Sequence, residues 1–166
     1  IDHAHHAGNA ANALTDTIEL SRAVAATLAR VDPAETLVIV TADHSHTMTM
    51  GGYPRRGNPI LGKVVFPGQE APALAGDGLP YTTLGYRNGR GFRDFGDETD
   101  ADRTYAEPPN PGRADLTAVD TEAPGFHQEA LVPTDSETHG GEDVAVYAIG
   151  PGAAAVSGVQ EQSNIF

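Results

Sequence analysis

The feature that most constrains this chain is an apolar run at residues 37–41 and the polar residues that follow it directly. Five successive apolar or β-branched residues predict a strand that is buried on both faces, as strands of a parallel sheet are. Open α/β sheets bind ligands at the carboxyl ends of their strands. Here that end carries Asp43 and His44, whose carboxylate oxygen and imidazole nitrogen are ligands that zinc accepts. We therefore expect the first two ligands of a divalent-cation site at this point.

Two more groups of residues are candidate metal ligands. Asp2 and His6 are four residues apart, which places both side chains on one face of a helical turn. Taken alone, this histidine-rich start could equally be a solvated polar loop, but Asp43 and His44 favour the metal interpretation. His139 precedes a glycine pair, which lets the backbone pass close to a ligand, and then an apolar run at 144–149. The isolated His127 is expected to be an ordinary surface or packing residue.

The remaining sequence predicts one long helix and one loop-rich region. Apolar residues spaced for a helix extend over residues 9–30, and the Asp32-Pro33 pair ends that pattern. A short return strand is expected at 47–50, and a weak helix at 153–160. The region 57–135 is rich in proline and glycine and has short β-like runs but no long periodic helix. A structureless loop of that length is unusual, so we expect a small subdomain.

Composition excludes several classes of partner. The chain has 23 acidic and 10 basic residues, a formal charge of -13, so it repels nucleic acid and anionic membranes. It has no cysteine, so any metal must be held by His, Asp or Glu. No stretch is long and apolar enough to span a membrane. The chain begins at Ile1 without a methionine, and we expect it to be a piece of a longer protein. The acidity indicates either a protein from a salty environment or a surface that favours solubility.

Three motifs resemble, in the same order, the metal-binding motifs of the alkaline phosphatase family. They are Asp2-xxx-His6, Thr41-Ala42-Asp43-His44-Ser45-His46, and Glu137-Thr138-His139-Gly140-Gly141-Glu142-Asp143-Val144. Gly51-Gly52-Tyr53 and Arg56-Gly57-Asn58 resemble the animal-type branch of that family. The resemblance covers nearly the whole chain, closely at the motifs and loosely between them. Three motifs in order are far more specific than any one of them.

The resemblance implies a fold and an activity. The fold is α/β, a three-layer α/β/α sandwich with a mainly parallel central sheet, formed here by residues 1–51 and 136–166. Residues 52–135 would form an inserted, loop-rich, crown-like subdomain. The activity is metal-dependent hydrolysis of phosphate monoesters through a phosphoserine intermediate. The family's nucleophilic serine, bridging aspartate, phosphate-binding arginine and magnesium ligands are expected upstream, so this segment alone should be inactive.

The resemblance also implies two zinc ions, one magnesium ion and a role for each motif residue. Asp2, His6 and His139 would hold the first zinc, and Asp43 and His44 would help to hold the second. Two histidines would have supporting roles: His46 would orient a ligand carboxylate, and His3 would lie near the phosphate or the magnesium. Tyr53 would reach the neighbouring subunit of a homodimer. Ser45, between ligands, is expected to be structural. The family implies a periplasmic or secreted protein.

Two rival classes remain open at this point. A phosphodiesterase, sulfatase or phosphomutase of the same superfamily would share the sheet and the Asp-His pair, although the run at 138–143 favours the phosphatase. A non-catalytic zinc-binding protein could use the histidines of residues 1–6, but it would not need ligands at three separate places. The physiological substrate and any membrane anchor are not predicted.

Overall fold

The computed structural model describes residues 1–165, which divide into two compact units. Unit 1 comprises Ile1–Asp16 and His46–Thr138. Unit 2 comprises Thr17–Ser45 and the residues from His139 onward. The chain therefore passes from one unit to the other inside a helix, between Ser45 and His46, and between Thr138 and His139. Residues 52–135, predicted as an inserted subdomain, all belong to unit 1.

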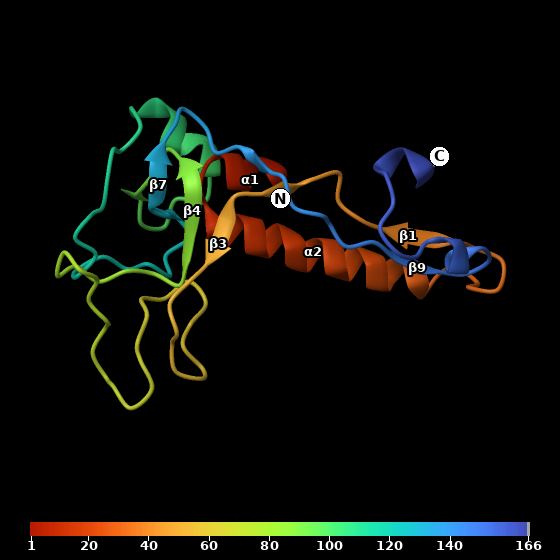
Figure 1. The fold of residues 1–166 in the computed structure, drawn as a ribbon, viewed down its shortest axis with the longest axis horizontal. Helices are drawn as coiled ribbons and strands as arrows, with labels where there is room; N and C mark the ends of the chain where they lie inside the picture. The colour runs from red at the N-terminus through yellow and green to blue at the C-terminus, as the bar shows by residue number, and fades with distance from the viewer. Residues whose placement is uncertain (166) are drawn as a thin grey trace. The chain divides into compact units, whose positions relative to one another are not determined.

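Two helices begin the chain (Figure 1). Helix α1 spans Asp2–His6 and helix α2 spans Ala10–Leu28, which confirms the helix predicted at 9–30. Helix α2 begins at this point because two side chains satisfy its first backbone N–H groups. Asn9 Oδ1 accepts a hydrogen bond from the Asn12 N–H (2.8 Å), and Gln128 Oε1 accepts one from the Ala10 N–H (2.7 Å).

Unit 1 is built on a three-stranded sheet in the order β3-β4-β7. Strand β3 (Met48–Met50) is antiparallel to β4 (Leu84–Gly89), which runs parallel to β7 (Ala130–Pro133) (Figure 1). The return strand predicted at 47–50 is thus confirmed. Strand β5 (Arg93–Asp94) pairs antiparallel with β6 (Phe126–His127), and Ala101–Ala106 forms the 3-10 helix η1.

The core of unit 1 contains both apolar and polar side chains. Leu84, Leu116 and Phe126 are almost completely buried, and removal of such side chains from water is the main source of stability. His127 is buried with them and donates from Nδ1 to the Ala7 carbonyl (2.9 Å). It is therefore a packing residue, one of the two roles expected for it.

Unit 2 contains the strand predicted at 37–41, but shorter and with a different partner direction. Strand β1 spans Val38–Val40 and pairs antiparallel with β9 (Tyr147–Ile149), with Ile39 opposite Ala148. The predictions of a parallel neighbour and of burial on both faces are wrong for this chain, since all three β1 residues are only half-buried. Burial on both faces requires layers above and below the strand, and the described residues of unit 2 do not supply both.

Short elements complete unit 2. Strand β2 spans Ser45–His46, of which Ser45 belongs to unit 2 and His46 to unit 1, and β8 spans His139–Gly140. The helix predicted at 153–160 is wrong: Ala153–Ala155 forms only a short 3-10 helix, η2, and Gln162–Ile165 forms another, η3. Gly152 and Gly158 flank that stretch with positive φ angles of 84° and 73°, which a continuous α-helix does not allow.

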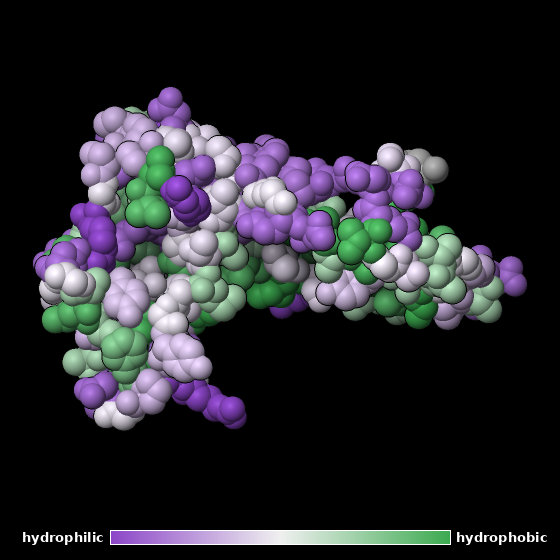
Figure 2. All heavy atoms as spheres, viewed as in Figure 1, coloured by the Kyte–Doolittle hydropathy of each residue, from purple (hydrophilic) through white to green (hydrophobic). Residues whose placement is uncertain are grey.

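The described residues thus form a mixed α/β structure with small sheets. Of the strand pairs whose directions are given above, β4–β7 is parallel and the other three are antiparallel. The mainly parallel central sheet expected from the sequence is therefore not formed within residues 1–165. Polar and apolar side chains are intermixed on the face seen in Figure 2. No helix among these residues is long and apolar enough to cross a membrane.

Candidate metal centre

Helix α1 brings Asp2 and His6 together in unit 1. Asp2 Oδ1 and His6 Nε2 are 3.4 Å apart. This separation exceeds a typical N–H···O hydrogen bond of roughly 2.7–3.2 Å. Two ligand atoms bound to one tetrahedral zinc, each at roughly 2.0–2.1 Å, lie about 3.3–3.4 Å from each other. The spacing of this pair therefore fits a zinc ion held between the two side chains.

The second ring nitrogen of His6, Nδ1, makes a hydrogen bond to the backbone. Nδ1 of His6 donates a hydrogen bond to the carbonyl oxygen of Glu137 (2.6 Å). With its hydrogen on Nδ1, the neutral ring carries a lone pair on Nε2, the atom that faces Asp2. Metal-binding histidines in proteins usually show this arrangement, with one nitrogen on the metal and the other on a carbonyl or carboxylate.

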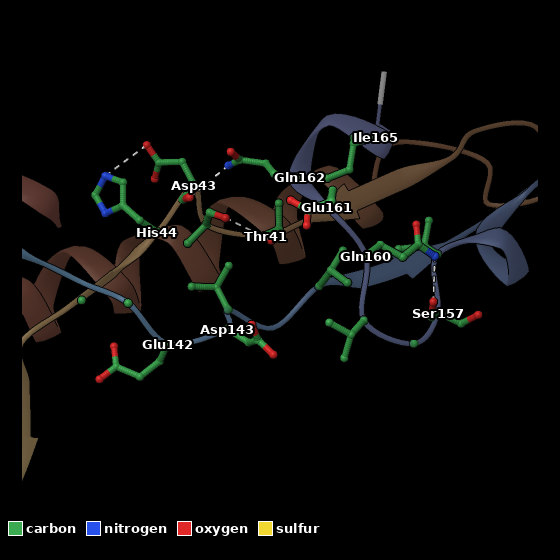
Figure 3. A pocket seen from close by; sticks show the side chains of 18 residues that line it. Thr41, Asp43, His44, Glu142, Asp143, Ser157, Gln160, Glu161, Gln162 and Ile165 are labelled. Carbon is green, nitrogen blue, oxygen red and sulfur yellow. Dashed lines mark hydrogen bonds and ion pairs between the residues drawn. The ribbon is translucent and has the colours of Figure 1, made fainter.

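Asp43 and His44 form a second pair of the same kind in unit 2. Asp43 Oδ2 and His44 Nε2 are again 3.4 Å apart, and a dashed line marks this pair in Figure 3. Nδ1 of His44 donates to the Ser45 carbonyl oxygen (3.2 Å), so that its Nε2 also carries the lone pair. The Asp2–His6 and Asp43–His44 pairs thus share the same O···N distance and the same hydrogen bond from Nδ1 to a backbone carbonyl. Each pair offers zinc a carboxylate oxygen and an imidazole nitrogen.

His139, the remaining predicted zinc ligand, also lies in unit 2. Its ring stacks on that of His44, with ring centroids 3.4 Å apart and an angle of 16° between the planes. Within unit 2, His44 thus contacts both Asp43 and His139; within unit 1, Asp2 contacts His6.

His46 contacts a predicted ligand carboxylate. Its Nε2 donates to Asp2 Oδ1 (2.9 Å) and its Nδ1 donates to Glu137 Oε2 (2.8 Å). Only 8% of the His46 side chain is exposed. Each ring nitrogen of His46 thus faces a carboxylate oxygen, which can only accept a hydrogen bond. His46 therefore contacts the carboxylate of Asp2; its role in orienting a zinc ligand stays a prediction.

The sequence reasoning missed Glu137. Its side chain is 0% exposed, and its second oxygen, Oε1, accepts from the Thr47 N–H (2.6 Å) and the Thr47 hydroxyl (2.8 Å). A glutamate within a polar run gives no indication of burial in the sequence. The available signal was its position in the same motif as His139, two residues before that histidine.

The ring of His5 packs against the ring of His46. The two rings stack with centroids 4.6 Å apart, and His5 Nδ1 is hydrogen-bonded to the Tyr86 hydroxyl (2.9 Å). Burial, together with the nearby His46, lowers the pKa of His5 to about 4. Burial likewise raises the pKa of Tyr86. Both groups are therefore neutral near pH 7, and they serve as packing partners for His46.

His3 and Tyr53 are both strongly exposed. The His3 side chain is 91% exposed, and its Nε2 lies 4.0 Å from Asp2 Oδ2. It lines a hollow of about 270 Å³ together with His6, Asp102, Tyr105 and Ser136. Tyr53 is 83% exposed and borders another hollow with Met50 and Arg55.

A third cavity, about 310 Å³, lies beside Asp43 and His44 (Figure 3). Its walls include Glu142, several valines and the segment that carries Gln162, whose side chain donates to the Asp43 carbonyl oxygen (3.0 Å). Ser45 donates from Oγ to Glu142, a hydrogen bond that lowers the pKa of this carboxyl group. The Ser45 hydroxyl thus holds a neighbouring side chain, as expected for a structural residue. The cavity gives a small ligand access to the second Asp-His pair.

Comparisons with known proteins agree on one family. The family model described as "Alkaline phosphatase" matches residues 1–166. The chain is 43% identical over 166 residues to "Alkaline phosphatase, tissue-nonspecific isozyme" of Gallus gallus and 39% identical to that of Homo sapiens; each match covers 99% of this chain and 28% of the relative. It is 38% identical over 165 residues to "Alkaline phosphatase" of Gadus morhua, covering 99% of this chain and 30% of that protein. The chain thus spans less than a third of the length of these relatives.

Proposed function

This chain belongs to the alkaline phosphatase family, and we propose that it supplies the zinc-binding part of a hydrolase of phosphate monoesters. The observation that carries the proposal is the pair of matched Asp-His contacts, each 3.4 Å between oxygen and Nε2. In both pairs a backbone carbonyl oxygen accepts the hydrogen of Nδ1, and Nε2 is the nitrogen that faces the aspartate.

The proposed ligand sets follow the family motifs. Asp2, His6 and His139 hold the first zinc, and Asp43 and His44 help to hold the second. A pair of such ions, when bound, stabilises the attacking and leaving oxygens of an in-line phosphoryl displacement. His46 keeps the Asp2 carboxylate in place, and the cavity beside Asp43 receives part of the substrate.

We assign no nucleophile to this chain. We propose that the nucleophilic serine, the bridging aspartate, the phosphate-binding arginine and the magnesium ligands belong to other parts of the natural protein. Residues 1–166 alone should then show no phosphatase activity, because catalytic groups that act as a unit lose most of their rate when one is missing. His3, exposed beside Asp2, is proposed to lie near the phosphate or the magnesium.

The larger architecture is also a proposal. Several apolar side chains around the β1–β9 pair are exposed within this chain, including Leu37 at 42% and Ile149 at 48%. Burial of such side chains would supply a substantial driving force for packing against further layers. We propose that β1 and β9 belong to a three-layer α/β/α sandwich in the whole protein. Residues 52–135 then form its crown-like subdomain.

The exposed Tyr53 supports a proposed homodimer. Aromatic side chains are favoured anchors of protein interfaces, and Tyr53 is 83% exposed next to the similarly exposed Met50. A periplasmic or secreted location follows from the family alone. Sedimentation of the natural protein checks the dimer: the proposal expects a dimer at micromolar concentration that Tyr53→Ala weakens, and a monomeric wild type would refute it.

Hydrolysis assays on the natural protein test the main proposal. An aryl phosphate monoester should be hydrolysed faster than the matching diester or sulfate, and a chelator should abolish the reaction until zinc and magnesium are restored. A preference for the diester or sulfate would favour another enzyme of the superfamily. Zinc binding without hydrolysis of any of the three would favour a non-catalytic protein.

A further inference from the structure

Glu137 connects three segments of unit 1 that carry the proposed site. Its carboxylate is completely buried, and both oxygens are occupied: Oε2 accepts from His46 Nδ1 (2.8 Å), and Oε1 accepts from the Thr47 N–H (2.6 Å) and hydroxyl (2.8 Å). A buried carboxylate is strongly disfavoured without such partners. This carboxylate therefore fixes the ring of His46 and the start of the segment that leads into β3.

The backbone of the same residue holds the end of α1. The Glu137 N–H donates to the His6 carbonyl oxygen (3.0 Å), and the Glu137 carbonyl oxygen accepts from His6 Nδ1 (2.6 Å). The first bond fixes the backbone of His6, and the second fixes the orientation of its ring. Glu137 thus contacts one proposed zinc ligand directly and a second, Asp2, through His46.

We propose that Glu137 is a positioning residue for the first zinc. Its carboxylate holds His46, and His46 in turn holds the Asp2 carboxylate at 2.9 Å. This inference rests on the proposed function, because it assigns Glu137 a task in the same metal site. It adds a residue that acts on the ligands rather than on the metal.

The alternative is that Glu137 itself binds metal. His6, His46 and Glu137 each offer a ligand atom, and these atoms lie within 4.8 Å of one another. Hydrogen bonds from His46 and Thr47, however, already take three of the roughly four acceptor positions of this carboxylate. Its hydrogen-bonding capacity is instead directed at residues that hold ligands. An outer partner of this kind typically changes metal affinity by roughly 10–100-fold when it is replaced.

Glu137→Gln in the natural protein tests the proposal. The glutamine can still accept the Thr47 N–H through its oxygen, but its amide group then presents a donor to the His46 Nδ1–H. The affinity for zinc, measured by competition with a chelator, should fall about 10–100-fold. Unchanged affinity in a variant that folds would overturn the inference.

A double-mutant cycle separates positioning from a structural role. If Glu137 acts through His46, Glu137→Gln should weaken zinc binding by no more than about twofold once His46→Gln is present, because two residues in one chain of contacts are not additive. Equal effects of Glu137→Gln in both backgrounds would show that it acts independently of His46. Should Glu137→Gln fail to fold, His46→Gln alone must reproduce the loss of affinity, and wild-type affinity in it would refute the proposal.

A control variant completes the design. Glu129→Gln alters another glutamate of unit 1, which accepts from the Ala114 N–H (2.9 Å) and from Arg113. It should keep zinc affinity within about twofold. A wild type that binds no zinc would refute the proposed function, whereas a zinc-binding, active wild type with insensitive Glu137→Gln would refute this inference alone.

Discussion

At the scale of single residues, the proposed site depends on which ring nitrogen of each histidine faces an aspartate. His6 and His44 both donate from Nδ1 to a backbone carbonyl oxygen and point Nε2 at an aspartate. The sequence could predict the aspartates and histidines, because their spacing and order are local. It could not predict Glu137, because the contact with His46 joins residues 91 positions apart.

His127 predicts how stability depends on pH. Burial lowers the pKa of His127, with a smaller contribution from the charge of Arg93 in the same direction, while its bond to the Ala7 carbonyl opposes both. The folded pKa lies below the unfolded value of about 6.5, so the unfolded state binds more protons as the pH falls below that value. His127 should therefore destabilise the folded state as the pH drops below about 6.5.

Thermal unfolding checks this expectation. The unfolding temperature of the natural protein should fall between about pH 7.5 and 5.5, and His127→Gln should show a smaller fall because the glutamine does not titrate. The comparison concerns the pH dependence, since the variant is expected to be less stable at every pH. Identical pH dependence in the two proteins would contradict the assignment.

At the scale of elements, local sequence patterns predicted single helices and strands better than they predicted which strands pair with each other. Helical spacing predicted α2, and the alternation at 47–50 predicted β3. The direction of the partner of β1 was wrong because an apolar run indicates burial but does not encode which strand lies beside it. The helix expected at 153–160 failed because two glycines with positive φ interrupt it.

Gly150 tests the β1–β9 pairing. It has a φ of 110°, and a Cβ added there would collide with the carbonyl oxygen of Thr36, two residues before β1. Gly150→Ala should therefore strain the backbone and push β1 away from β9. The free energy of unfolding should fall by about 1–3 kcal/mol more than backbone strain alone accounts for.

Gly152→Ala is the matched control. Gly152 also has a positive φ, 84°, but a Cβ there meets no atom within 4 Å. It should lose only about 1–2 kcal/mol from the left-handed conformation. Urea unfolding of both variants distinguishes strain from collision, and equal losses would contradict the close approach of Gly150 to Thr36.

At the scale of the whole chain, charge is the dominant feature. The formal charge is -13, and residues 94–122 carry nine acids against two arginines. Like charges at this density repel one another and destabilise the compact state at low salt. We propose that the natural protein comes from a salty environment; a surface that simply favours solubility is the alternative.

Salt-dependent unfolding decides between these interpretations. The Debye length shrinks from roughly 30 Å at 0.01 M to about 3 Å at 1 M salt, which screens the repulsion. The unfolding temperature should therefore rise from low to molar sodium chloride. A temperature that stays level or falls would leave only the solubility interpretation.

The zinc content of the natural protein tests the central claim most directly. After dialysis, elemental analysis should find about two zinc ions per chain in the wild type, as a two-metal site requires. Asp2→Ala and Asp43→Ala should each lose about one of them, because each breaks a different Asp-His pair. Glu129→Gln, outside both pairs, should keep both ions. A wild type without zinc, or variants that keep the full wild-type content, would contradict the account.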